Sequence, residues 1–418
     1  MKTIIYNIGK LYTMKNNIVP LRKDELDKCE VLENAYIVIN HDIIEAVGTG
    51  DYSKYVQEHT ALFDAQGKIA MPGLVDAHTH LVFGGSREHE YDLKLKGASY
   101  LDILKAGGGI LNTVKATREA SFDELYNKSM DFADSMLLHG VTSVEAKSGY
   151  GLNLETELKQ LKVATKVNED HPINIVNTYM PAHAIPTEYK ENPKEYVDIV
   201  INEMLPSTEA REMADYVDIF CEDAVFNREQ SKEILEVAQS YGFKVKIHAD
   251  EVVPMGGASL AAELGAISAE HLMATSEEDM ELMAKANVIA NLLPATTFNL
   301  GVDYARARLM IEKGIAISVC SDFNPGSCPT ENLQLALQIA SRGYKLTPIE
   351  VYNAAIVNGS CALELNDEIG SIEEGKQADI VIMNADNIEY TIYHFGVNHV
   401  QHVFKDGELV VEDQILVY

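Results

Sequence analysis

The sequence predicts an α/β fold: a (β/α)8 TIM barrel with a small β-sandwich domain formed by the N- and C-terminal segments. Three observations lead to this prediction. Short apolar runs alternate with amphipathic segments between about residues 70 and 345, both ends of the chain change into short alternating strands, and 418 residues suit one barrel plus a modest second domain. We therefore expect the barrel over 69–345 and a composite β domain over 1–68 and 346–418, the latter helical from about 346 to 366.

The barrel strands are predicted from eight apolar runs rich in valine and isoleucine, which is typical of strands buried on both faces of a parallel sheet. The runs cover residues 74–80, 141–147, 173–183, 217–223, 244–250, 267–272, 288–294 and 316–322. Apolar residues return at three- and four-residue steps over 228–241, 276–286 and 304–312, which predicts crossover helices between the later strands. Eight parallel strands with such crossovers close into a barrel.

The stretch from residue 81 to residue 140 is too long for one crossover helix. Its GGSRE (84–88) and KAGGG (105–109) pieces indicate loop, so we expect an elaborate loop after the first strand, at the end where barrels carry their active sites. The Gly107–Gly109 run lacks the Lys and Ser/Thr of a phosphate-binding loop, and a flexible loop is the better interpretation.

The two ends of the chain read as alternating strands separated by turn residues, at 35–50, 375–386 and 402–414. Neither end is long enough to build a good core alone. We therefore expect them to pack together into one domain beside the barrel.

Charge and cysteine usage exclude several function classes. The net charge of -30, from 64 acidic and 34 basic residues, repels nucleic acid and anionic membranes. An anionic small-molecule substrate would need a specific cation, which makes Arg87 interesting. Five scattered cysteines and the lack of an apolar stretch of about 18 residues predict a cytoplasmic protein with no membrane span.

His78 and His80 form the strongest local signal for a metal site. Residues two apart on a strand face the same side, roughly 6 to 7 Å apart, so both imidazoles can reach one cation. An isolated HxH pattern is common by chance. The position of this pair at the end of a barrel strand favours a site, because ligands gather at that face.

Other polar residues also end apolar strands: His183, His248, His271 and Asp322. Each alone is more simply a strand-end residue with no function. Because these strand ends face a common centre, the presence of all four residues there favours a functional site. Three histidines and one aspartate suit Zn(II) or Fe(II), and such an ion lowers the pKa of water from about 15.7 toward 7, which indicates hydrolysis.

Two further segments have both a functional and an ordinary interpretation. Glu251, three residues after His248, can shuttle protons or bind substrate, or it is a helix-leading acid. The segment 322–327, with its Asn and Gly, lets the backbone approach a ligand, and it also reads as a turn before a helix.

The strings PGLVDAHTH (72–80), HADE (248–251) and EHL (270–272), together with Asp322, resemble the amidohydrolase superfamily over almost the whole chain. The string GSIEEGKQADIVI (370–382) resembles that superfamily's return into its composite β domain.

The resemblance implies a role for each matching residue. One divalent or trivalent ion per subunit, Zn or Fe, would be bound by His78, His80, His248 and Asp322. Glu251 and His271, with Asp322, would move protons. The substrate pocket would be lined by Arg87, Tyr150, His183, Glu251, Asn324, Gly326 and Ser327. The resemblance also suggests a homodimer.

Longer strings, such as HTHLVFGGSREHE (78–90), YLDILKAGGGIL (100–111) and SDFNPGS (321–327), are similar to one branch of the superfamily that opens the ring amide of a small anionic substrate. This implies that Arg87 holds the substrate carboxylate. One alternative is a cytosine- or guanine-type aminohydrolase, which shares the metal ligands but acts on a neutral base. Another is a barrel that binds without catalysis. Arg87 and the loops at 148–151 and 323–327 argue against the first, and the complete set of competent ligand residues argues against the second.

Overall fold

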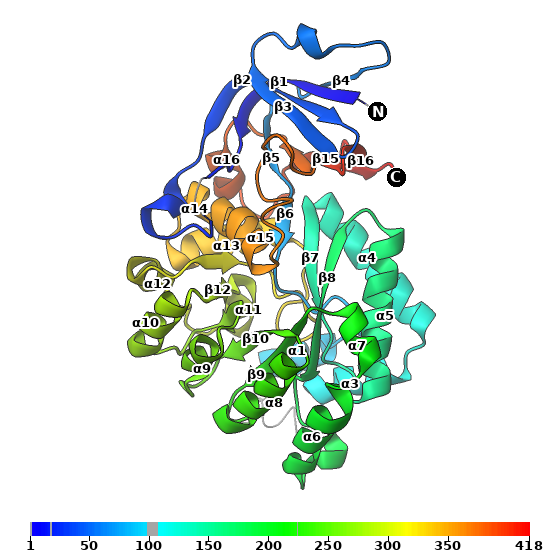
Figure 1. Ribbon diagram of the computed structural model, residues 1–418, viewed down its shortest axis with the longest axis vertical. Coiled ribbons are helices and arrows are strands. Elements are labelled where there is room, and N and C mark those ends of the chain that lie inside the picture. The colour runs from blue at the N-terminus through cyan, green and yellow to red at the C-terminus, as the bar shows by residue number, and fades with distance from the viewer. Residues whose placement is uncertain (1, 17–18, 98–107, 224) are drawn as a thin grey trace.

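The computed structural model describes residues 2–16, 19–97, 108–223 and 225–418. An α/β barrel forms one end of the molecule, and a β domain that carries both ends of the chain forms the other (Figure 1). Among the described residues, no helix combines the length and the apolar character needed to cross a bilayer.

Eight parallel strands form the barrel wall and pair in chain order, which confirms the predicted fold class. Each lies within one residue of a predicted run or inside it. The strands are β6 (Leu74–Asp76), β7 (Val141–Lys147), β8 (Asn174–Ala182), β9 (Tyr216–Cys221), β10 (Lys244–Ala249), β11 (Ser268–His271), β12 (Ile289–Leu292) and β13 (Ile317–Val319).

The last and the first barrel strands are joined by the chain that follows each of them. The Asp322 N–H donates to the His78 carbonyl at 3.0 Å, and the His80 N–H donates to the Phe323 carbonyl at 2.8 Å. The Ser321 N–H donates to the Asp76 carboxylate at 2.9 Å. The closure of the barrel therefore brings together two segments that the sequence places more than two hundred residues apart.

The predicted crossover helices between the later strands are present as α8 (Arg228–Ser240), α10 (Glu277–Ala286) and α12 (Ala307–Lys313). The last begins three residues later than the pattern predicts, and the ring of Tyr304 packs against that of Tyr344 at 5.6 Å instead of joining the helix. Further helices of this part are α4 (Phe122–Leu138), α5 (Leu154–Asp170), α6 (Pro193–Ile199), η4 (Val200–Met204), α7 (Thr208–Met213), α9 (Gly257–Leu264), α11 (Pro294–Leu300) and α13 (Leu333–Tyr344).

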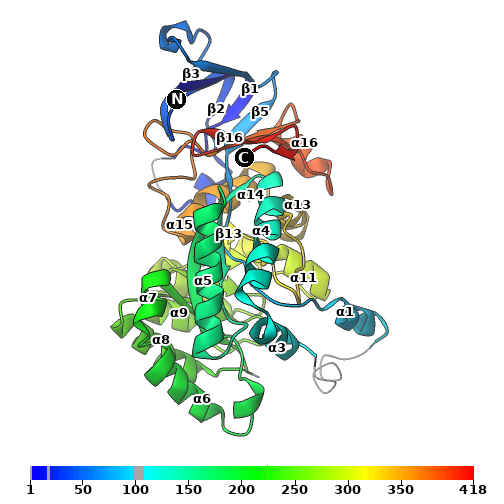
Figure 2. The same ribbon diagram turned by 90° about the vertical axis from the view of Figure 1, so that its right-hand side faces the viewer.

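The connection after β6 contains α1 (Glu88–Leu95) and α3 (Ile110–Glu119) before the crossover helix α4. Figure 2 shows α1 and α3 at the barrel, away from the β domain. Gly109 precedes α3 with a φ of 81°, a left-handed conformation that suits glycine. Most of the string at 100–111, including Gly107, lies outside the described residues.

The two ends of the chain build one continuous nine-stranded sheet in the order β17-β16-β15-β14-β5-β1-β2-β3, with β4 paired to β1. Phe63 of β4 packs edge-on against Phe404 of β15 at 5.0 Å, so strands far apart in this order face each other across a core. The strands are β1 (Lys2–Tyr12), β2 (Val31–Asn40), β3 (Ile43–Thr49), β4 (Ala61–Asp64), β5 (Ile69–Pro72), β14 (Ile380–Met383), β15 (Val400–Lys405), β16 (Glu408–Glu412) and β17 (Ile415–Leu416). Because β5 belongs to this sheet, the sheet extends past residue 68 as far as Pro72.

The segment between the barrel and the returning strands is helical, with α14 (Pro348–Asn353), the π-helical turn η5 (Ala354–Asn358) and α15 (Gly359–Ala362). The buried amide of Asn358 donates to the Ile317 carbonyl of β13 at 2.7 Å and accepts from the Leu21 N–H at 2.6 Å. This side chain ties the N-terminal segment to the barrel wall.

Candidate metal centre

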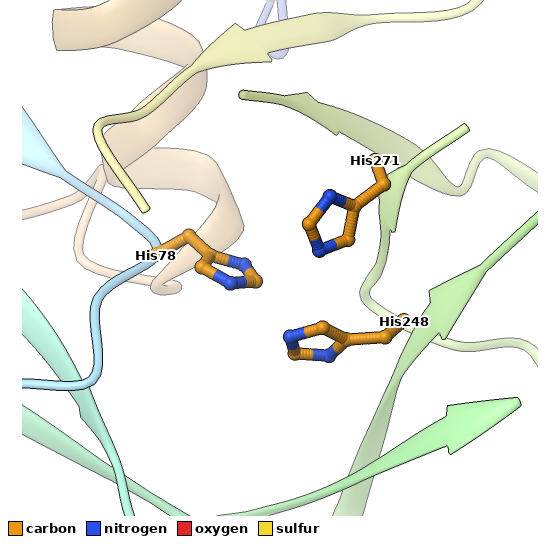
Figure 3. A group of neighbouring side chains, drawn as sticks. All are labelled: His78, His248 and His271. Atoms are coloured by element: carbon orange, nitrogen blue, oxygen red, sulfur yellow. The ribbon is translucent and has the colours of Figure 1, made fainter. Parts of the chain in front are cut away.

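Three histidines from three barrel strands converge at the carboxyl ends of those strands. His78 follows β6, His248 lies near the end of β10, and His271 ends β11. One ring nitrogen from each lies within 4.8 Å of the others, and all three side chains are buried. Figure 3 shows the three rings directed toward one shared space.

A second group shares His78 and adds His80 and Asp322, with ligand atoms again within 4.8 Å of one another. The Asp322 Oδ1 lies 3.4 Å from His78 Nε2 and 3.9 Å from His80 Nε2. The structure therefore brings together the four residues that the sequence nominated as ligands, and His271 lies in the same cluster.

Local backbone geometry directs two of these side chains into the cluster. His271 and Asp322 have φ values of 69° and 59°, in the left-handed region that costs a non-glycine residue about 1–3 kcal/mol. Asp322 is held there by the Thr296 hydroxyl, which donates to its Oδ2 at 2.5 Å, and by its own N–H on the His78 carbonyl. The surrounding hydrogen bonds offset this strain.

The chemistry of the cluster fits a metal ion. His78 Nε2, His80 Nδ1, His248 Nε2 and His271 Nδ1 are buried and lack hydrogen-bond partners in the described structure. Burial holds the pKa of His78 and His80 well below the usual range and lowers the pKa of His271 to about 3, so these rings are neutral. Neutral imidazoles with free lone pairs, beside a carboxylate, are ligands for Zn(II) or Fe(II).

Two carboxylates that the sequence reasoning missed contact the far side of the histidine rings. Glu270 Oε2 lies 2.7 Å from His78 Nδ1, and the Ser268 hydroxyl donates to the other Glu270 oxygen at 2.5 Å. Asp218 Oδ2 lies 3.1 Å from His248 Nδ1. Such contacts fix the orientation of an imidazole and leave its other nitrogen for a metal.

These carboxylates belong to a fully buried layer of charges beneath the cluster. Lys147 Nζ lies 2.8 Å from Asp218 and 2.9 Å from Glu145, and Lys246 Nζ lies 2.7 Å from Glu145. Burial disfavours the charge on Lys147, yet the Asp218 and Glu145 carboxylates raise its pKa overall. The signal was present in the sequence, because Glu145 and Lys147 alternate on one strand as Lys246 and His248 do on another.

Tyr150 and His183 form a wall beside His80. The rings of His183 and His80 stack, with their centroids 4.8 Å apart and their planes inclined by 12°. The centroid of the Tyr150 ring lies 5.5 Å from that of His80. The Tyr150 loop is shaped by buried Glu157, whose carboxylate accepts from the N–H groups of Gly149, Gly151 and Leu152 at 2.8–2.9 Å.

Glu251 lies at the edge of the cluster, with its Oε2 3.7 Å from His271 Nε2. Burial raises the pKa of the Glu251 and Asp322 carboxyl groups above their usual range. A carboxyl group with a raised pKa exchanges protons closer to neutral pH, which suits general acid–base work.

The loop after β13 is folded around Asn324. Its side-chain oxygen accepts from the N–H groups of Gly326 and Ser327, both at 2.8 Å, and its amide donates to the Asp322 carbonyl at 2.7 Å. Arg87 lies against Gly326. The anchor nominated from the sequence is thus held next to the loop that carries Asp322.

Comparison with known proteins gives a consistent result. The model of the Amidohydrolase family matches residues 69–410. The imidazolonepropionase of Alkaliphilus metalliredigens (strain QYMF) is 53% identical over 412 residues, which cover 98% of each chain. That of Streptococcus sanguinis (strain SK36) is 50% identical over 411 residues, also 98% of each chain.

Solved structures share the fold at much lower identity. The atrazine chlorohydrolase TrzN from Arthrobacter aurescens TC1, complexed with zinc, superposes with a TM-score of 0.73 at 17% identity, covering 99% of this chain and 96% of that chain. An adenosine deaminase from Xanthomonas campestris with bound zinc gives a TM-score of 0.72 at 18% identity, covering 99% and 94%.

Replacement of Glu270 by glutamine should weaken zinc binding about 10- to 100-fold, because a neutral amide holds and orients the His78 ring more weakly than the carboxylate does. Competition with a chromophoric chelator measures this dissociation constant. Glu350→Gln is the matched control, since Glu350 is a buried carboxylate that pairs with Arg308, outside the metal cluster. Equal zinc affinity of Glu270→Gln and wild type would contradict the role given to Glu270.

Proposed function

The chain belongs to the amidohydrolase family and, within it, to the imidazolonepropionases, and from this we propose that it hydrolyses 4-imidazolone-5-propanoate to N-formimino-L-glutamate. The observation that carries the proposal is identity of about half over nearly the full length of curated imidazolonepropionases. The histidine cluster and Arg87, which packs against the loop that follows Asp322, are chemically consistent with this proposal.

We propose that His78, His80, His248 and Asp322 hold one Zn or Fe ion. When bound there, such an ion supplies acidified water and polarises a carbonyl oxygen. The donor set supports this assignment, because the buried ring nitrogens have no other partner among the described residues. His271 lies close enough to contact the same centre.

Proton transfer is assigned to Glu251, His271 and Asp322. Hydrolysis adds the oxygen of water to the ring carbonyl carbon, breaks the amide C–N bond, and moves a proton from that water to the released nitrogen. Glu251 Oε2 is suited to take and return this proton, because burial raises its pKa. His271, neutral and 3.7 Å from Glu251, is suited to hydrogen-bond the oxygen that gains negative charge.

Binding of the substrate is assigned to the pocket residues around this centre. Arg87 pairs with the side-chain carboxylate of the substrate, since a guanidinium binds a carboxylate with two parallel hydrogen bonds. This local cation answers the repulsion expected from a net charge of -30. Tyr150 and His183 form a wall for the planar ring, and Asn324, Gly326 and Ser327 bring the backbone close to it.

An aminohydrolase that acts on a neutral base is less well supported. The solved structures of a chlorohydrolase and a deaminase are only 17–18% identical and show the fold alone. A neutral base offers no carboxylate to the terminal nitrogens of Arg87. A barrel that binds without catalysis is also disfavoured, because Glu251 and His271 supply competent acid–base groups at the cluster.

We also propose a cytoplasmic homodimer. All five cysteines are free thiols, as expected in a reducing compartment. The homodimer follows from the family resemblance and is measured by light scattering of the purified protein.

The activity is tested with freshly generated 4-imidazolone-5-propanoate. We expect its ultraviolet absorbance to fall when the protein is added, to persist after treatment with a chelator, and to fall again after zinc or iron is restored. Cytosine and guanine serve as comparison substrates. Faster turnover of either base than of the imidazolone would overturn the proposal in favour of an aminohydrolase.

Replacement of Glu251 by glutamine should lower kcat by about 10² to 10⁴, the usual contribution of a general acid or base. Because burial raises the pKa of Glu251 above its usual value of 4.5, the wild type should lose activity on acidification at a higher pH than an exposed carboxyl group would cause. The acidic limb of the profile should shift in Glu251→Gln, and the limb that remains reports on Asp322, whose carboxyl pKa burial also raises. A variant that keeps the rate and the pH profile of the wild type would refute the assignment.

Replacement of Arg87 by alanine should lower kcat/KM about 10- to 100-fold, which corresponds to the roughly 1.5–3 kcal/mol of a hydrogen bond to a charged group. Arg211→Ala, which removes an exposed arginine from α7, is the control for the change in net charge. Equal kcat/KM in the Arg87 variant and wild type would exclude Arg87 as the anchor.

A further inference from the structure

Arg87 is held along one edge by Glu90, a buried residue in the first turn of α1. The Arg87 Nε donates to Glu90 Oε2 at 3.0 Å. The other carboxylate oxygen, Oε1, accepts from the Gly109 N–H at 2.9 Å, just before α3. Glu90 thereby joins the arginine to the starts of two helices, and it is only 2% exposed to solvent.

The guanidinium of Arg87 packs against Gly326. A Cβ atom added at this glycine would lie 2.2 Å from Arg87 Nη1 and 2.8 Å from Cζ, closer than real contacts allow. Gly326 does not have a positive φ, so alanine fits its backbone conformation. The glycine is therefore needed for the space it leaves to Arg87 and not for its own flexibility.

This arrangement connects Arg87 to the metal centre. Gly326 is held by Asn324, whose amide bonds the carbonyl of Asp322. On the other side, the Tyr150 ring lies 5.5 Å from the His80 ring, and its phenol is near enough to Arg87 to interact electrostatically with it. Displacement of the guanidinium would change its position relative to the reacting ring.

The terminal nitrogens of Arg87 differ from its Nε in their contacts with the described residues. In the described parts of the chain, only the Nε of Arg87 donates to a protein group, while Nη1 and Nη2 have no such partner. Glu90 thus takes the side-chain edge of the guanidinium and leaves available the edge that binds a carboxylate with two hydrogen bonds.

We propose that Glu90 is a positioning residue and that Gly326, by lacking a side chain, leaves the space that the Arg87 guanidinium occupies. Together they hold Arg87 in position for the carboxylate of the substrate. They thereby set the selectivity of binding for an anionic over a neutral side chain. The inference rests on the proposed function, because it takes a substrate carboxylate as the partner of Arg87. A long flexible side chain that is ordered before binding loses less conformational entropy when the ligand arrives.

Two other roles for Glu90 make different predictions. If Glu90 only stabilises the connection between α1 and α3, its loss weakens binding of charged and neutral ligands equally. If its negative charge mainly opposes the ligand, its loss strengthens binding of the carboxylate. Only a positioning role makes the loss specific to the carboxylate.

The test compares two stable ring analogues, imidazole-4-propanoate and its carboxamide, by calorimetry on the zinc-loaded protein. For both Glu90→Ala and Gly326→Ala we expect the dissociation constant of the carboxylate to rise about tenfold or more, as suits a lost preorganised ion pair. The carboxamide should change by less than about threefold in Glu90→Ala, and in Gly326→Ala, where the added methyl group also lines the ring pocket, it should change less than the carboxylate does. Glu88→Ala is the matched control, because Glu88 is an exposed acid in the same turn of α1.

Equal weakening for both analogues, tighter binding of the carboxylate, or no change in either variant would overturn the inference. If Glu90→Ala does not fold, Gly326→Ala still tests the inference. A variant is taken as folded when its zinc content equals that of the wild type. Turnover of 4-imidazolone-5-propanoate by the wild type is measured separately. Its absence would reject the proposed function, while the ratio of the two dissociation constants still reports on Glu90 and Gly326.

Discussion

Burial of charge at the carboxyl ends of the barrel strands is the constraint on which the rest of this structure depends. An isolated ion in a protein interior is strongly disfavoured, so buried carboxylates and ammonium groups must pair. Here Glu145 and Asp218 pair with Lys147 and Lys246, and Glu270 pairs with His78 beside them. This layer lies beside the histidine cluster, whose grouped ligand atoms are suited to a cation.

The same backbone hydrogen bonds close the barrel and bring the candidate metal ligands together. The backbone hydrogen bonds between the segments after β13 and β6 involve Asp322, His78 and His80 themselves. A displacement of either segment would therefore open the barrel and separate the candidate ligands together. This coupling explains how Asp322 is kept at a positive φ, since its N–H and its carboxylate are both occupied.

Buried polar side chains also shape the loops around the centre. Glu157 gathers three backbone N–H groups of the Tyr150 loop, Asn324 folds the loop after β13, and Glu90 joins Arg87 to the start of α3. In each case a side-chain carboxylate or amide forms hydrogen bonds with backbone groups of the loop that have no regular backbone partner. Irregular segments can therefore hold side chains in fixed positions beside the rigid barrel.

The sequence by itself determined the strands of the barrel, the helices between its later strands and the alternation that puts His78 and His80 on one side, because local periodicity reflects which residues are buried. It also nominated His183, His248, His271 and Asp322 from their places at strand ends. Tertiary structure alone decided that His271 lies with His78 and His248, since this depends on a positive φ and on the curvature of the closed sheet. The sequence also did not reveal the partners Glu270, Asp218 and Glu90. Periodicity and residue spacing indicate which face of an element a side chain occupies, but not which distant side chain it contacts.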